Sequence, residues 1–143
     1  MRHILFHTSD IRSLMLIRLM TGFVFLSEGI QKFLFADALG VGRFIKIGIP
    51  DPQFFAPFVG IIEIVAGILL LAGLLTRIAA LLLFIDISVA IFTTKFPMLD
   101  NSFWTFAHET RTDFCMFIGT FILMIYGGGK WSADKLLSKD EPT

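Results

Sequence analysis

Four apolar stretches, each about as long as a bilayer is thick, constrain the fold of this chain more than any other feature. They run over residues 14–35, 54–75, 78–97 and 112–128. A transmembrane helix needs about 20 mostly apolar residues, and helices and closed barrels are the structures that satisfy backbone hydrogen bonds in lipid. The sequence therefore predicts an all-α fold: an integral membrane four-helix bundle with both termini on the same side.

The composition agrees with this prediction. Hydrophobic residues make up 55% of the 143 residues, a share too high for a soluble domain of this size. The formal net charge is zero, so no basic field indicates nucleic acid as a partner, and we expect the partner to be the lipid bilayer. The single Cys115 excludes an internal disulfide, a CxxC redox pair and a thiolate metal site within one chain.

The pattern divides the chain into an N-terminal segment (1–13), a four-span membrane domain (14–129) and a polar C-terminal tail (130–143). We expect a tight hairpin at 75–77, an interfacial or re-entrant segment at 36–53 and a connection at 98–111. Because cytoplasmic loops carry an excess of Lys and Arg, six basic residues on the terminal side against four on the other predict cytoplasmic termini. The six are Arg2, Arg12, Arg77, Lys130, Lys135 and Lys139, and the four are Arg43, Lys46, Lys95 and Arg111.

Each apolar stretch contains an acidic residue or has one at its edge: Glu28, Glu63, Asp86 and Asp113. An unpaired charge at the centre of a membrane helix costs about 2.5–3.5 kcal/mol on insertion scales, so such residues pair, face a hydrated cavity or serve a function. These four residues are therefore candidates for ligand binding or proton handling.

Helical periodicity shows where these groups point. In the first stretch Arg18, Gly22, Glu28, Gly29 and Lys32 share one face, which must look into the bundle. Glu28 and Lys32 are also four residues apart, in the favourable order for an ion pair.

The second stretch repeats this design, with Glu63 between Gly60 and Gly67 on one face. We expect Gly22, Gly29, Gly60 and Gly67 to be helix-packing positions. Arg18, Glu28 and Lys32 fit a structural ion-pair network as well as a functional site, whereas Glu63 and Asp86 have no local partner and favour function. Arg77 and Lys95 fit snorkelling anchors at span ends.

Haem and metal sites are not expected. A haem held by two His needs ligands at matching depth, but His108 lies at the opposite side from His3 and His7. Three His and one Cys on two sides assemble neither a metal site nor a nucleophile–base pair, so the catalytic residues stay unknown and an enzyme acting alone is not expected.

Several segments resemble the DoxX family of small integral membrane proteins. RLMTGFVFLSEGIQKF is similar to the first span of that family, and PFVGIIEIVAGILLLAGLLTRIAALLL to its second and third spans. RTDFCMF and GGGKWSADKLL are similar to its fourth span and its terminus with Trp-Ser-x-Asp. The resemblance covers about residues 14 to 137. The positions that match the family motif are Arg18, Gly22, Gly29, Lys32, Glu63, Gly67, Arg77 and Asp113.

The resemblance implies a four-helix membrane bundle, in a bacterial plasma (inner) membrane, related to subunits of quinone-linked or oxidative-stress-related redox complexes. No residue with an established catalytic role carries over. Quinone is the possible cofactor under this resemblance. Because the chain has no Cys pair, haem pair or nucleotide motif, electrons must come from a redox partner protein or from a bound quinone.

Three functions follow as hypotheses. The first is a non-haem membrane subunit of such a redox complex. The second is a non-catalytic scaffold or assembly factor, in which small-residue faces contact other membrane proteins. The third is a transporter of protons or a small solute, for which one protomer is cramped and a homo-oligomer would supply the room. The sequence leaves the choice among them open.

Overall fold

The computed structural model describes residues 8–139; residues 1–7, with Arg2, His3 and His7, and residues 140–143 lie outside the described part. The described chain is mainly helical and contains no strand. Its elements in chain order are α2 (Leu14–Leu34), α3 (Ala36–Leu39), α4 (Val41–Lys46), α5 (Pro52–Ala72), α6 (Thr76–Ala90), the π-helix η1 (Ile91–Lys95), the 3₁₀ helix η2 (Phe96–Asp100), α7 (Phe103–Tyr126) and α8 (Ala133–Lys139).

Periodicity in the sequence explains how the long helices pack. In α2 the buried residues recur at three- and four-residue intervals and include Arg18, Gly22, Phe25 and Gly29. The large apolar residues on the other face, such as Phe23 at 60% exposure, point outward. A helix with small and polar residues inside and large apolar residues outside is suited to lipid, where apolar side chains cost nothing to expose.

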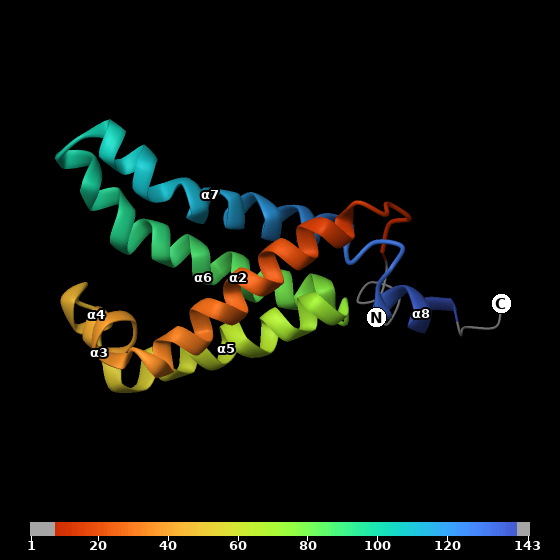
Figure 1. The fold of residues 1–143 in the computed structure, drawn as a ribbon, viewed down its shortest axis with the longest axis horizontal. Coiled ribbons are helices and arrows are strands. Elements are labelled where there is room, and N and C mark those ends of the chain that lie inside the picture. Colours follow the sequence, from red (N-terminus) through yellow and green to blue (C-terminus); the bar gives the residue numbers. More distant parts are fainter. Residues whose placement is uncertain (1–7, 140–143) are drawn as a thin grey trace.

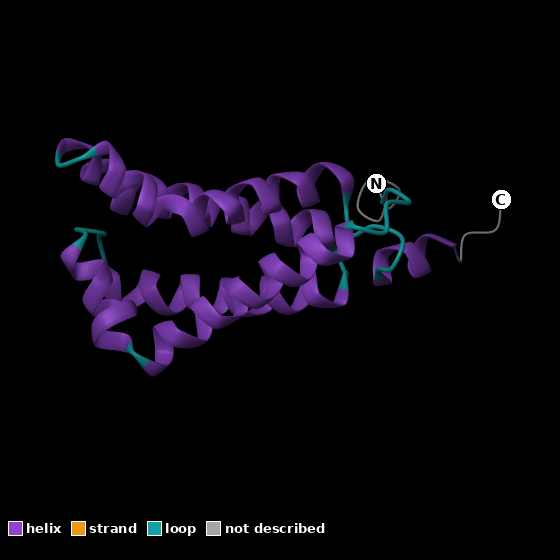
Figure 2. Ribbon diagram, turned by 45° about the horizontal axis from the view of Figure 1, so that its top comes forward, coloured by secondary structure: helices purple, strands orange, loops and turns teal. Residues whose placement is uncertain are grey.

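Two helix pairs form the body of the molecule (Figure 1). Helix α2 packs along α5, and α6 packs along α7. The pairs meet near the short turn between α5 and α6, where Gly73 (φ 69°) and Leu75 (φ 48°) adopt the left-handed conformation. Toward the other end, which carries α3, α4, η1 and η2, the two pairs diverge (Figure 2). The predicted tight hairpin is therefore present, at residues 73–75.

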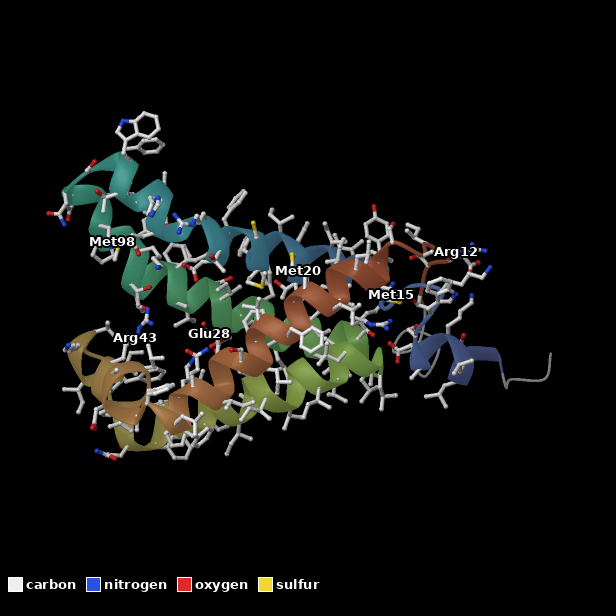
Figure 3. All side chains as sticks on the ribbon, viewed as in Figure 1. Arg12, Met15, Met20, Glu28, Arg43 and Met98 are labelled. Atoms are coloured by element: carbon white, nitrogen blue, oxygen red, sulfur yellow. The ribbon has the colours of Figure 1, made fainter. Side chains whose placement is uncertain are left out.

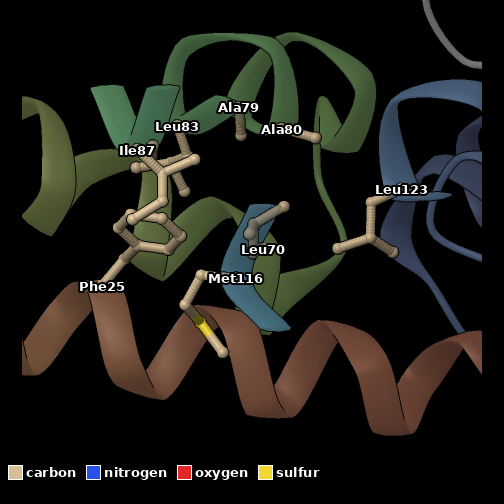
Figure 4. Close-up of a cluster of buried hydrophobic side chains, with 9 residues drawn as sticks. Phe25, Leu70, Ala79, Ala80, Leu83, Ile87, Met116 and Leu123 are labelled. Carbon is tan, nitrogen blue, oxygen red and sulfur yellow. The ribbon is translucent and has the colours of Figure 1, made fainter. Parts of the chain in front are cut away.

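The core lies where the two pairs meet (Figure 4). It is built from small and medium apolar side chains of all four long helices, with Phe25 from α2, Leu70 from α5, Leu83 from α6 and Leu123 from α7 at 2% exposure or less. Since burial of such side chains fixes helix against helix by close packing, the core holds the two pairs together at this end.

Three helical stretches among the described residues are long and apolar enough to cross a membrane: Leu14–Leu34, Pro52–Ala72 and Thr76–Asp100. Helix α7 is 24 residues long, but its first half contains the charged residues Glu109, Arg111 and Asp113. The helix begins at Phe103, whereas the sequence pattern predicts a connection up to residue 111. The reason is that no Gly or Pro follows Pro97 until Gly119, so nothing interrupts the helix there.

The first connection also contains helix. Residues 36–46 form the short helices α3 and α4, which are separated at Gly40, and Gly48 (φ 74°) ends the segment. Phe44 is its buried residue, and Ile45 is exposed. The placement of this segment at the membrane interface, or as a re-entrant segment, stays a prediction.

Candidate functional site

An ion pair between two membrane-spanning helices forms the centre of the candidate site. The Lys32 ammonium of α2 donates a hydrogen bond to Glu63 Oε1 of α5 (2.9 Å) and lies 2.6 Å from Glu63 Oε2. Glu63 is only 4% exposed. The i, i+4 spacing is favourable for an ion pair of Lys32 with Glu28. In the structure Lys32 pairs with Glu63 of the neighbouring helix, whose carboxylate is buried, whereas Glu28 is exposed.

Two further carboxyl groups lie beside this pair. Asp86 of α6 lies close enough to act electrostatically on both Glu63 and Lys32. Glu28 of α2 acts electrostatically on Asp86. Figure 3 places it on the side of α2 that faces α6, where its side chain is exposed and not buried as the shared face of α2 predicts. We call Lys32, Glu63, Asp86 and Glu28 the Lys32 cluster. It draws on both helix pairs and therefore joins α2 and α5 to α6.

The chemistry of the Lys32 cluster follows from its composition. Three carboxyl groups, of which that of Glu28 is exposed, stand against one ammonium group, so negative charge is in excess. Glu63 Oε2 is buried and accepts no well-directed hydrogen bond. Such a group can accept a hydrogen bond from a ligand hydroxyl or hold a proton in transit.

Arg18, the other candidate cation of α2, lies in a different part of the molecule. Its Nη1 donates a hydrogen bond to the Gly128 carbonyl (2.8 Å), and the charge of Asp134 acts on it electrostatically. The Asp134 carboxylate accepts hydrogen bonds from the backbone N–H groups of Leu75 (2.7 Å) and Thr76 (2.9 Å). We call Arg18, Gly128 and Asp134 the C-terminal clasp.

The clasp has a structural purpose. The first N–H groups of a helix lack partners within that helix, and Asp134, which is 1% exposed, supplies them for α6 from 58 residues away. Asp134 and Gly128 are not among the residues that the helix faces single out. The signal that points to Asp134 is its place in the GGGKWSAD motif, where a Gly-rich turn precedes a lone acid.

Asp113 pairs with Lys95 rather than with the Lys32 cluster. The Lys95 ammonium lies 3.2 Å from Asp113 Oδ2 and donates a hydrogen bond to the Glu109 carbonyl (2.9 Å). This contact ties η1 to α7. Arg77, at the other end of the same stretch, donates a hydrogen bond to the Ile125 carbonyl (2.7 Å). Both cations that the sequence treats as span-end anchors therefore bind α7.

The four glycines lie where α2 and α5 approach most closely. A Cβ on Gly29 would stand 2.7 Å from the Gly60 carbonyl oxygen, and a Cβ on Gly67 would stand 3.0 Å from the Gly22 carbonyl oxygen. These positions let two backbones touch, which is how small residues act in membrane helix packing. Their contacts are made within this chain.

The remaining reactive side chains do not gather. The imidazole nitrogens of His108 lie 2.7 Å from the Arg111 guanidinium, and Cys115 is exposed on α7. Among residues 8–139 no group of three or more His, Cys, Asp or Glu side chains could hold a metal ion.

The fold and the site together define the class: an all-helical membrane protein with a charged cluster inside its apolar helices. Comparison with known proteins gives the family. The DoxX family model matches residues 13–95, and the chain belongs to that family.

Two relatives illustrate its range. "Uncharacterized membrane protein Rv3486" of Mycobacterium tuberculosis is 49% identical over 142 residues, which cover 94% of this chain and 87% of that protein. "Putative oxidoreductase CatD" of Bacillus subtilis is 33% identical over 90 residues, which cover 62% of this chain and 65% of that protein. No solved structure gives a significant match.

Proposed function

We propose that this protein is a small, non-haem membrane subunit of a quinone-linked or oxidative-stress-related redox complex. The observation that carries the proposal is the Lys32 cluster, in which three helices bring one cation and three carboxyl groups together between apolar helices. Ionisable groups within membrane helices are costly and mark proton or substrate sites. The name of the Bacillus subtilis relative, which calls it an oxidoreductase, points the same way.

A quinone suits the groups that are present. Its carbonyl oxygen is a hydrogen-bond acceptor for the Lys32 ammonium, and the hydroxyl of the reduced form is a donor for the unsatisfied Glu63 Oε2. Reduction of a quinone takes up protons as well as electrons, and Glu63 and Asp86 are placed to hold those protons. The electrons come from a partner protein in this proposal.

The proposed topology has four spans and cytoplasmic termini. Helix α7 is the fourth span, since it packs along α6 and its second half is apolar. The described N-terminal segment and the segment after α7 lie at one end, where Ser9 N–H bonds the Tyr126 carbonyl and Lys130 N–H bonds the Ile11 carbonyl. The positive-inside rule places this end in the cytoplasm of a bacterial cell, and the membrane is then the plasma (inner) membrane.

The test is to purify the protein in a mild detergent and to measure quinone in the lipid extract. We expect quinone to copurify with the native chain and to be lost from Glu63→Gln and Asp86→Asn. Asp113→Asn, which changes a carboxylate outside the cluster, is the matched control and should retain it. Absence of quinone and of any redox partner protein from the native preparation contradicts the proposal.

The scaffold hypothesis is weakened by one observation. It assigns Gly60 and Gly67 to contacts with other membrane proteins, but in this structure both glycines contact α2 of the same chain. The small-residue face is therefore already covered.

A further inference from the structure

A groove lies at the clasp end of the molecule, outside the Lys32 cluster. It has a volume of about 440 Å³ and is formed between the last residue of α5 and the segment that leads into α8. Its lining residues are Ala72, Lys130, Trp131, Ser132, Ala133 and Leu136. Because Ala72 ends a candidate membrane span, the groove stands at the boundary between the apolar and the polar part of the chain.

The groove has one apolar side and one cationic side. Trp131 is 55% exposed and Leu136 is 68% exposed, so large apolar surfaces are uncovered at a position where the chain has left its apolar helices. Lys130 is exposed between them, and the Arg12 guanidinium lies over the Trp131 ring at 6.0 Å from its centroid. An indole with cations around it is the arrangement found at the headgroup level of a bilayer.

Two acids near the groove, Asp134 and Asp10, have partners outside it. Asp134 is buried and both of its oxygens accept hydrogen bonds from backbone amides. Asp10 forms an ion pair with Lys135 (3.0 Å). Among residues 8–139, the cations at the groove are Lys130, which lines it, and Arg12, which lies over the Trp131 ring.

We propose that this groove binds the headgroup of an anionic phospholipid from the leaflet at the clasp end. Lys130 and Arg12 contact the phosphate and any further negative charge of the headgroup, while Trp131, Leu136 and Ala72 contact the glycerol and the first part of the acyl chain. A bilayer lipid is the occupant because the groove continues the apolar surface of α5 and combines that surface with cations, which a soluble anion does not need. This inference is independent of the quinone proposal.

The experiment uses the fluorescence of the two tryptophans of the chain to report which lipids lie next to each of them. Trp131 is observed alone in the Trp104→Phe variant, and Trp104, at the opposite end beside η2, is observed alone in Trp131→Phe. Each variant is reconstituted into phosphatidylcholine vesicles that contain either brominated phosphatidylglycerol or the same fraction of brominated phosphatidylcholine, because bromine quenches tryptophan fluorescence on contact.

We expect Trp131 to be quenched more strongly by the brominated phosphatidylglycerol and Trp104 to be quenched equally by both lipids. Lys130→Gln should lower the local enrichment of the anionic lipid about fivefold, the contribution of one basic residue near an anionic surface. Arg12→Gln is the second variant with the same expectation, and Lys46→Gln, an exposed lysine of α4, is the control that leaves the Trp131 signal unchanged.

Equal quenching of Trp131 by the two brominated lipids overturns the proposal. So does a preference for phosphatidylglycerol that survives both Lys130→Gln and Arg12→Gln, since the groove cations are then not its cause. Because these changes are at exposed side chains, circular dichroism and size-exclusion profiles should match the native chain.

Discussion

The Lys32 cluster and the C-terminal clasp each bring a basic residue of α2 near a buried carboxylate, Glu63 in the first and Asp134 in the second, but the two carboxylates have different hydrogen-bond partners. In the clasp both oxygens of Asp134 accept hydrogen bonds from fixed backbone amides, and Arg18 donates to a backbone carbonyl. In the Lys32 cluster the partners are side chains, and Glu63 Oε2 has no directed hydrogen bond. Backbone partners fix a structure, whereas side-chain partners can exchange a proton or admit a ligand.

The largest expected effect is on the clasp. Asp134→Ala removes the acceptor for two N–H groups at the start of α6 and leaves Arg18 buried without its acid. We expect a loss of about 3–5 kcal/mol in the free energy of unfolding, because two N–H groups each lose a hydrogen bond to a charged acceptor, worth about 1.5–3 kcal/mol apiece. Unfolding in SDS, followed by circular dichroism, measures it. Asp37→Ala, at an exposed acid, is the control. Equal stability of the two variants would contradict the claim that Asp134 stabilises the fold more than an exposed acid does.

Breaking the Lys32 cluster should cost less. Lys32→Met leaves Glu63 without its cation, but Glu63 can take up a proton and become neutral, so we expect a loss of about 1–3 kcal/mol. The double variant Lys32→Met/Glu63→Gln should be more stable than Lys32→Met alone, since it leaves no unpaired carboxylate. The same SDS unfolding assay checks both. If the double variant is no more stable than the single one, Lys32 does not stabilise the fold through its ion pair with Glu63.

The close contact between α2 and α5 is the next feature to test, since it holds Lys32 and Glu63 within reach of each other. Gly29→Ala should cost about 1–3 kcal/mol, because the new methyl group meets the Gly60 carbonyl and the backbone must shift. Gly60→Ala should cost less, because its methyl group meets the ring of Phe33, a half-exposed side chain that can move. Thermal denaturation in detergent ranks the two variants. The reverse order would mean that the contact of Gly60 with Phe33, and not the contact of Gly29 with the Gly60 carbonyl, is the tighter one between α2 and α5.

The smallest effect is expected at the half-buried Lys95–Asp113 pair. Its side chains are 13% and 24% exposed, and Asp113→Asn removes a contact of the kind that contributes about 0–1 kcal/mol in solvent-accessible settings. We expect a shift of a few degrees or less in the denaturation temperature. A loss as large as that of Asp134→Ala would show that η1 is held by this pair alone.

The sequence was sufficient for the family, the all-helical class and most helix bounds, and the structure shows why. Apolar length and 3.6-residue periodicity are local properties, so α2 and α5 follow from the residues themselves. The start of α7 was missed because residues 103–111 are polar and aromatic, a composition that fits a loop as well as a helix. The pairing of Lys32 was also missed, since an i, i+4 neighbour is visible in a sequence and a residue 31 positions away is not.

By itself, the sequence determined that this chain is a membrane protein of the DoxX family with charges that its apolar helices cannot leave unpaired. Only the tertiary structure decided which charges meet: Lys32 with Glu63 and Asp86, Arg18 with Gly128 and Asp134, and Lys95 with Asp113. The physical reason is that burial and hydropathy act on each residue along the chain, whereas an ion pair depends on the distance between helices. That distance is set by the glycines and the small core residues through which the helices touch.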